Sequence, residues 1–281
     1  DWSSDVCSSD LSIRSFRYLF SMNNLLEKER EGEEDMEPLI RSDMVFSSSV
    51  QYFGNNTATI TIQTEKYAIQ VPITCESETT LEDVGKQVWS GSVLMCEYAL
   101  RHKDTFHART VLEVGSGTGL FARVVSPLCQ HVIATDYTDS ILSVLRRNTA
   151  MCSNVEIRQL NLLDTCAFDV VSDSEPIDLV VAADMIYDEV LTESLCRYLS
   201  SVLSHHRCFA LVSGEHRLNI VDASDSLIDY EFDRFQEFVC FNEDCWNQFQ
   251  VKSTGSLSFK HRCSCGKRLV GQMIPLGASA K

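Results

Sequence analysis

The chain has 281 residues, 44% of them hydrophobic, and a formal net charge of −16 at pH 7. This length and apolar content suffice for one α/β domain of about 200 residues with an N-terminal extension. The acidic charge argues against direct nucleic-acid binding and favours a basic partner such as a lysine-rich protein surface. No apolar run approaches the ~20 residues of a membrane span, so we expect no membrane partner.

The first 40 residues are expected to lie outside the fold. Residues 1–11 have no apolar periodicity and resemble a translated adapter sequence, so they are excluded from fold reasoning. Met22 or Met36 is a candidate start, and the segment from Glu27 to Glu37 holds seven acids. We therefore interpret residues 1–40 as a disordered or artefactual acidic segment.

Residues 41–79 show the alternation of apolar and polar side chains that is typical of strands. Thr57–Thr64 and Tyr67–Ile73 alternate most clearly, which predicts a small N-terminal β extension, a hairpin or meander. The segment from Leu81 to Gly91 follows and contains Trp89, and residues 92–100 are expected to form an amphipathic helix. Trp89 is either a core residue or a cover over a nucleoside ligand.

A glycine-rich loop follows a buried strand at residues 111–114 and precedes a helix that starts at residue 120. Gly115, Gly117 and Gly119 are spaced as G-x-G-x-G, and Glu113 lies two residues before the first of them. A dinucleotide loop has G-x-G-x-x-G spacing and binds a pyrophosphate, which the Glu113 carboxylate would repel. S-adenosylmethionine (SAM) carries an ammonium and a sulfonium and no phosphate, so it suits this loop better. A tight turn without a ligand is the simpler alternative.

The next predicted strand, residues 130–136, ends in Asp136, about 20 residues past the first glycine. A carboxylate at this place can accept hydrogen bonds from both ribose hydroxyls of SAM or of NAD. Alternatively, Asp136 caps the helix expected over residues 141–148.

The α/β alternation continues to about residue 239. A third strand over residues 155–164 places Asn161 at its end, either beside an adenine amine or as a loop cap. A fourth strand starts at Asp178, and its residues 179–183 are a continuous apolar run of the kind found in buried parallel strands. The run stops at Asp184, and Tyr187 follows three residues later. Further elements are predicted at 191–203 (helix), 207–215 (strand), 224–239 (helix), and 247–251 with 257–262 (antiparallel hairpin). The tail from Ser264 is expected to be poorly ordered.

Twelve cysteines are scattered through the predicted elements. This pattern indicates reduced thiols in the cytosol or nucleus. Neither Cys240 with Cys245 nor Cys263 with Cys265 has C-x₂-C spacing, so we predict no metal site and leave zinc as the alternative.

The order of these motifs is that of a known family. A tryptophan-bearing loop, E-x-G-x-G-x-G, an acid after the second strand and D-x-x-Y after the fourth together resemble the seven-β-strand family-16 protein lysine methyltransferases. The resemblance covers about Arg41 to Val239. It implies a Rossmann-like, seven-stranded sheet with helices on both faces, within a SAM-dependent methyltransferase domain at 80–263 and an uncertain tail at 264–281.

The resemblance also implies an activity, which is methyl transfer from SAM to the ε-amine of lysine on a non-histone, nuclear nucleic-acid-binding protein. Asp184 and Tyr187 would lie near the acceptor amine, with Asp184 attracting the ammonium. Chaperones are expected as further partners, and the nucleus or cytoplasm as the location. The implied cofactor residues are Trp89, Glu113, Gly115, Ser116, Gly117, Gly119, Asp136, Asn161 and Ala183.

Three alternatives stay open at this point. A methyltransferase acting on a small molecule or nucleic acid would use the same SAM half of the site. A catalytically inactive SAM-binding scaffold would bind the cofactor without methyl transfer. An NAD-dependent oxidoreductase is disfavoured by Glu113 and by the glycine spacing.

Overall fold

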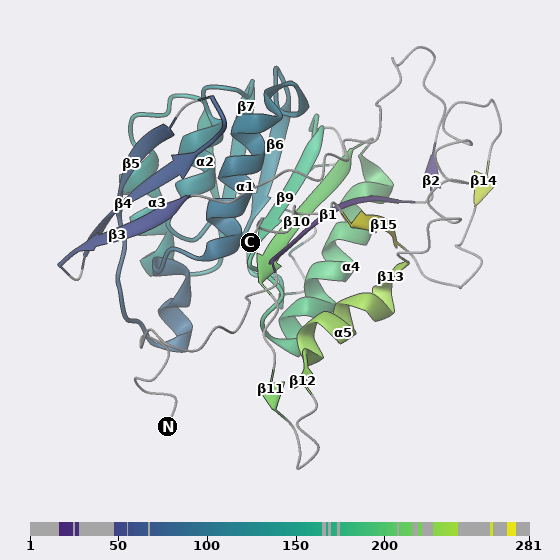
Figure 1. Ribbon diagram of the computed structural model, residues 1–281. Helices are drawn as coiled ribbons and strands as arrows, with labels where there is room; N and C mark the ends of the chain where they lie inside the picture. Colours follow the sequence, from purple (N-terminus) through teal and green to yellow (C-terminus); the bar gives the residue numbers. More distant parts are fainter. Residues whose placement is uncertain are drawn as a thin grey trace.

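The computed structural model describes residues 17–24, 26–27, 48–54, 56–66, 68–164, 167, 170–172, 175–206, 208–215, 219–220, 227–240, 259–260 and 269–273. Its centre is a twisted sheet with helices on both faces (Figure 1). No helix within these residues combines the length and apolar character needed to cross a bilayer.

Five parallel strands form one side of this sheet, with β8 at its edge. In spatial order they are β8 (Val155–Gln159), β7 (His131–Asp136), β6 (Thr110–Val114), β9 (Leu179–Ala183) and β10 (Phe209–Glu215). The chain runs outward from β6 to β7 and β8, and then returns to the other side of β6 through β9. The strand order therefore reverses between β6 and β9, and ligands of such sheets bind at the carboxyl ends of the two strands at this switch point.

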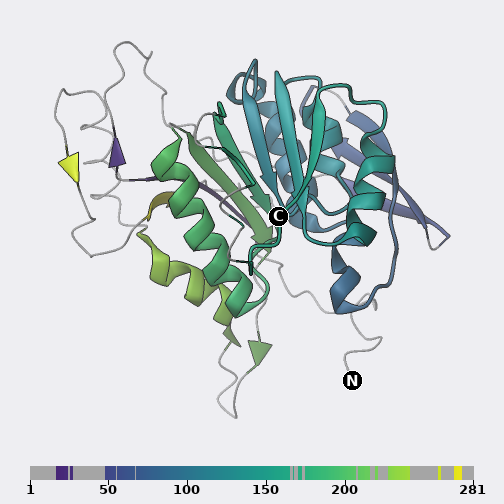
Figure 2. The ribbon, with the colours of Figure 1, turned by 180° about the vertical axis from the view of Figure 1, so that it is seen from behind.

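Side-chain alternation in the strands separates two cores, because successive residues of a strand point to opposite faces. Val111 and Val181 pack with α1 (Ser90–Arg101), α2 (Leu120–Val125) and α3 (Asp139–Thr149). Leu112 and Val180 pack with α4 (Glu189–His205) and α5 (Tyr230–Phe238) on the opposite face (Figure 2). Both faces are covered, which explains why β6 and β9 are buried along their whole length.

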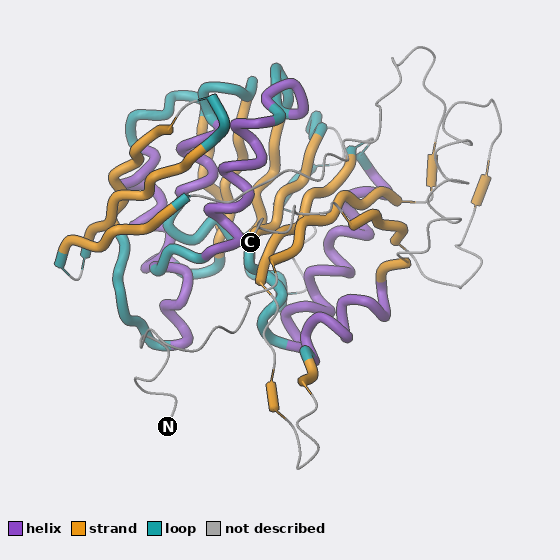
Figure 3. Tube along the Cα trace, in the orientation of Figure 1, coloured by secondary structure: helices purple, strands orange, loops and turns teal. Residues whose placement is uncertain are grey.

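A smaller sheet packs on the α1–α3 side and corresponds to the predicted N-terminal β extension. It consists of β3 (Ser49–Phe53), β4 (Thr57–Gln63) and β5 (Ala68–Thr74), paired antiparallel in that order. Ile60, Ile62 and Ile73 point into the same core as the three helices. Figure 3 shows how this sheet covers the helix layer.

The antiparallel part of the main sheet differs from the sequence expectation. β1 (Arg17–Asn24) pairs antiparallel with β10, and β15 (Leu269–Met273) pairs with β1. With β13 (Val239–Cys240), the main sheet has eight strands among the described residues, and the count of seven is not confirmed. Arg17–Asn24 and Leu269–Met273 therefore differ from the expected disordered segment and poorly ordered tail, because each finds its partner strand far away in the chain.

Two further expectations near the chain's end need correction. The predicted helix over 224–239 is shorter, since α5 is preceded by β12 (Leu227–Ile228), which pairs with β11 (Asn219–Ile220). Phe259–Lys260 forms β14 and pairs antiparallel with β2 (Leu26–Glu27), a partner that the sequence did not predict. Residues 247–251, Cys245, Cys263 and Cys265 lie outside the described residues. The rest of the division into domains stays a prediction.

One buried amide joins the small sheet to the glycine loop. The Asn148 side chain on α3 accepts a hydrogen bond from the Thr74 N–H at 2.8 Å and donates to the carbonyls of Thr74 at 2.8 Å and Thr118 at 2.7 Å. The residue is 5% exposed, so water cannot replace these bonds. Asn148 thereby fixes the end of β5 beside the loop that follows β6.

We expect Asn148→Ala to lower the free energy of unfolding by roughly 2–4 kcal/mol, because three backbone groups lose their partner. Urea denaturation would measure this change. Gln159→Ala is the control, since the exposed Gln159 amide makes one bond, to the Tyr137 carbonyl. Equal effects of the two substitutions would contradict the bridging role of Asn148.

Candidate active site

The loop after β6 is shaped by three glycines in the left-handed region. Gly115, Gly117 and Gly119 have φ angles of 70°, 51° and 77°, which residues with a side chain rarely adopt. A Cβ atom on Gly115 would lie 2.0 Å from the Met185 Sδ atom, and one on Gly117 would lie 2.7 Å from the Gly85 carbonyl oxygen. Glycine is therefore required here both for the turn and for the close approach of neighbouring segments.

Glu113 is the buried acid of this loop. Its side chain is 2% exposed and accepts a hydrogen bond from the Ser116 hydroxyl at 2.8 Å. Burial raises the pKa of the Glu113 carboxyl to about 8, the Ser116 bond opposes the rise, and the Asp136 carboxylate adds to it. No cationic side chain among the described residues pairs with Glu113, so a cationic ligand would supply the missing opposite charge.

Asp136 lies at the end of β7 and faces the same loop. Its carboxylate accepts the N–H groups of Gly117 and Tyr137, each at 2.8 Å. Burial raises the pKa of Asp136, and these two backbone bonds oppose the rise. Asp136 thus orders the glycine loop and, as a carboxylate with two oxygens, keeps the acceptor capacity that ribose hydroxyls need.

The segment before α1 covers the glycine loop. Its 3₁₀ helix η1 (Leu81–Lys86) places Gly85 against Gly117, and the Tyr137 hydroxyl donates to the Glu82 carbonyl. Trp89 precedes α1 and donates its indole N–H to the Val84 carbonyl at 3.0 Å. The structure therefore brings the tryptophan-bearing loop to the glycine loop, although the two are distinct in sequence.

The chain leaves β9 through Ala183, Asp184 and Met185. Asp184 is 6% exposed and has a φ angle of 56°, an unusual conformation for a residue other than glycine. Its Oδ2 atom accepts the Gly91 N–H at the start of α1. Met185 lies against Gly115, so the exits of β6 and β9 are adjacent, as the reversal of strand order requires.

The remaining predicted residues, Asn161 and Tyr187, follow β8 and β9 at the same edge of the sheet. Asn161 follows β8, and its Oδ1 atom accepts the Leu163 N–H at 3.1 Å, which makes it a loop cap. Its neighbour Leu160 donates its N–H to the Asp136 carbonyl at 2.8 Å. Tyr187 is half-buried in the turn between Asp184 and the start of α4.

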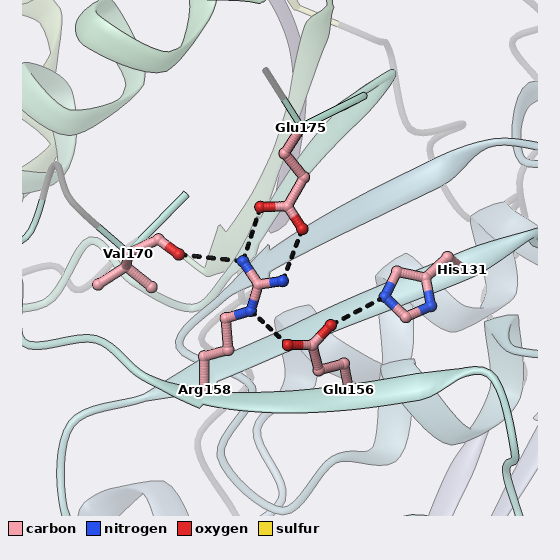
Figure 4. Close-up of polar contacts among 5 residues, drawn as sticks. All are labelled: His131, Glu156, Arg158, Val170 and Glu175. Atoms are coloured by element: carbon pink, nitrogen blue, oxygen red, sulfur yellow. Dashed lines mark hydrogen bonds and ion pairs between the residues drawn. The ribbon is translucent and has the colours of Figure 1, made fainter. Parts of the chain in front are cut away.

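An ion-pair cluster anchors the outer strand of the sheet. Arg158 on β8 donates to both Glu175 oxygens, at 2.6 and 2.7 Å, and to the Val170 carbonyl at 3.0 Å. Glu156 bridges Arg158 and His131 (Figure 4). The Arg158 guanidinium lowers the pKa of both glutamates. These contacts hold the β8–β9 connection beside β8, the strand that Asn161 follows.

Sequence reasoning missed several residues of this edge, which are Gly91, Asn148, Met185, Ser213 and Glu215. Gly91 was visible as the glycine of the Trp-Ser-Gly turn, and Glu215 as an acid at the end of a strand. The other three carried no local signal. The described residues contain no group of three or more His, Cys, Asp or Glu placed to hold a metal ion.

A sequence profile of the family described as lysine methyltransferase matches residues 70–226. The chain belongs to the lysine methyltransferase family. The matched segment runs from β5 through the glycine loop and past β10, so it contains every site residue described above. Members of this family take the methyl group from SAM, which is therefore the cofactor.

Individual relatives agree with this assignment. Methyltransferase-like protein 22 of Homo sapiens is 32% identical over 204 residues, covering 64% of this chain and 48% of the relative. The Mus musculus protein of that name is 36% identical over 163 residues, covering 50% and 42%. The electron transfer flavoprotein beta subunit lysine methyltransferase of Homo sapiens is 28% identical over 130 residues, covering 46% and 48%. The chain thus spans about half the length of these relatives.

The raised pKa of Glu113 predicts how stability depends on pH. The folded protein binds this proton more tightly than the unfolded chain, in which the pKa is near its ordinary 4.5. The stabilising contribution of Glu113 is therefore complete below pH 4.5 and is lost as the pH rises towards about 8. Glu113→Gln cannot ionise, so we expect its stability relative to the wild type to rise across this window.

Urea denaturation of both ligand-free proteins at a series of pH values would measure the difference. A difference that is constant between pH 4.5 and 8 would show that Glu113 titrates normally. The direct comparison cancels the contributions of the other titrating groups that the two proteins share.

Proposed function

We propose that this chain transfers a methyl group from SAM to the ε-amine of a lysine on another protein. The observation that carries this proposal is the buried acid Glu113 at the exit of β6, which lies beside the exit of β9. These strands flank the switch point of the sheet, and the chain belongs to the lysine methyltransferase family.

The residues around the glycine loop fit the cofactor. Glu113 offers a cationic group a buried carboxyl that has no cationic side-chain partner among the described residues, and the Asp136 carboxylate offers acceptors to hydroxyl groups. When bound, SAM supplies a methyl group that its sulfonium already activates. The protein therefore needs no group to polarise the leaving sulfur, and its contribution is alignment, which can be worth several kcal/mol.

The acceptor lysine must be neutral when it attacks. Its ordinary pKa is ~10.4, and removal from water lowers the pKa of an ammonium group. Tyr187 is half-buried in the turn that follows Asp184, so its ring would line the approach and exclude water. We assign no general base, and proton loss to water before docking is sufficient.

The target is expected to be a basic, non-histone protein that binds nucleic acid in the nucleus. The net charge of −16 supports a basic partner, because attraction between opposite charges accelerates their encounter. The same negative charge repels nucleic acid itself. We also propose that the enzyme lies in the nucleus or cytoplasm, where it would meet such a target.

Methyl transfer from labelled SAM into a cell lysate tests the proposal. We expect discrete labelled protein bands with the wild type and none with Gly115→Arg. The substitution places a side chain on a left-handed residue whose Cβ atom would collide with Met185. Tandem mass spectrometry of a labelled band should place the methyl group on a lysine side chain.

The matched control is Gly54→Arg. Gly54 has a φ angle of 63°, close to that of Gly115, but a Cβ atom there meets nothing within 4 Å. It lies in the turn after β3, away from the glycine loop. Full labelling with Gly115→Arg would contradict the proposed site. SAM binding by the wild type without any labelling would support an inactive scaffold instead.

A further inference from the structure

Three hydrogen bonds form a closed ring between the exits of β9 and β10 and the first turn of α1. The Asp184 N–H donates to the Ser213 carbonyl at 2.8 Å. The Ser213 hydroxyl donates to the Gly91 carbonyl at 2.8 Å, and the Gly91 N–H donates to the Asp184 carboxylate. The ring joins residues that lie up to 122 positions apart in the chain.

The ring is buried and leaves no spare room. Ser213 is 0% exposed and Asp184 is 6% exposed. A Cβ atom on Gly91 would lie 2.5 Å from the Asp184 Oδ2 atom and 2.9 Å from the Gly214 Cα atom. Asp184 also holds a left-handed conformation, which a protein retains only where the surrounding contacts enforce it.

The ring determines where Trp89 lies. Trp89 is the cap residue immediately before α1, and the Ser90 hydroxyl beside it donates to the Glu215 carboxylate. The Trp89 indole in turn holds η1, whose Gly85 carbonyl lies against Gly117 of the glycine loop. A continuous path of contacts therefore leads from Asp184 to the wall of the cofactor site.

The Asp184 carboxylate already has a favourable environment in this arrangement. It accepts a backbone N–H in the first turn of α1, where the helix carries a partial positive charge. Its negative charge is thus partly compensated by the protein itself. Glu113 also accepts hydrogen bonds, from the Ser116 hydroxyl and the Ala122 backbone, yet burial still raises its pKa to about 8.

We propose that Asp184 and Ser213 are positioning residues that fix the Trp89–Gly91 turn over the cofactor loop, and that Asp184 acts as a hydrogen-bond acceptor rather than as the counter-charge of the substrate amine. This refines the role expected for Asp184 from the sequence and rests on the proposed function for the identity of the cofactor.

Asp184→Asn separates the two roles, because asparagine keeps an acceptor oxygen and loses the charge. We expect Asp184→Asn to bind SAM within about threefold of the wild type, and Asp184→Ala and Ser213→Ala to bind at least roughly tenfold more weakly, since each breaks the ring. The double variant should lose less than the product of the two single effects, because both belong to one network. Calorimetric titration with SAM measures the wild type, the three single variants and the double variant Asp184→Ala/Ser213→Ala.

Ser126→Ala is the matched control, since Ser126 is also a buried serine but lies at the far end of α2. Hydrogen exchange of a peptide covering residues 87–95 provides a readout that needs no ligand. It should accelerate in Asp184→Ala and Ser213→Ala and stay slow in Asp184→Asn and Ser126→Ala. Exchange unchanged by Ser213→Ala, or SAM binding weakened equally by Asp184→Asn and Asp184→Ala, would overturn the proposal.

Methyl transfer into a lysate supplies the last comparison. We expect Asp184→Asn to label the same proteins as the wild type, within about threefold in rate. Loss of labelling in Asp184→Asn with SAM binding intact would overturn the proposal and restore the counter-charge role. If the wild type itself labels nothing, the proposed function fails, but SAM binding and hydrogen exchange still decide the role of the ring.

Discussion

The burial of Glu113 at the end of a central strand constrains the rest of the site. A carboxylate removed from water is costly unless an opposite charge or hydrogen bonds compensate it, and here the hydrogen bonds come from the Ser116 hydroxyl and the Ala122 backbone. The loop that follows must turn away tightly enough to leave a ligand room beside this acid. Left-handed glycines make that turn possible, and the acid explains why the loop suits a cationic nucleoside better than a pyrophosphate.

The part of the site formed by the β9 exit and the start of α1 depends on contacts between segments that are distant in the chain. The β9 exit lies beside the β6 exit because the strand order reverses there, and α1 is fixed to it through Asp184 and Ser213. The N-terminal sheet reaches the glycine loop through Asn148. A segment that precedes the glycine loop in sequence thus becomes part of its wall.

The sequence predicted those features that depend on residues close together in the chain. Apolar runs predicted β6 and β9, and the glycine spacing predicted the tight turn after β6. That this turn binds the cofactor stays a prediction. The sequence could not reveal β1 as a strand of the main sheet, because its partner β10 lies far away in the chain. Likewise, no spacing rule connects Ser213 with Gly91. The role expected for Asp184 was drawn from its position at the end of a strand, which does not show what its carboxylate contacts.

The most direct test of this account is a calorimetric titration of the wild type and Glu113→Gln with SAM and with NAD. The pH should be above 8, where Glu113 is mostly ionised. We predict that SAM binds the wild type, that it binds Glu113→Gln at least roughly tenfold more weakly, a difference of about 1.4 kcal/mol, and that NAD gives no binding heat. Binding of NAD, or equal affinity of the two proteins for SAM, would contradict the claim that a buried carboxylate selects a cationic cofactor.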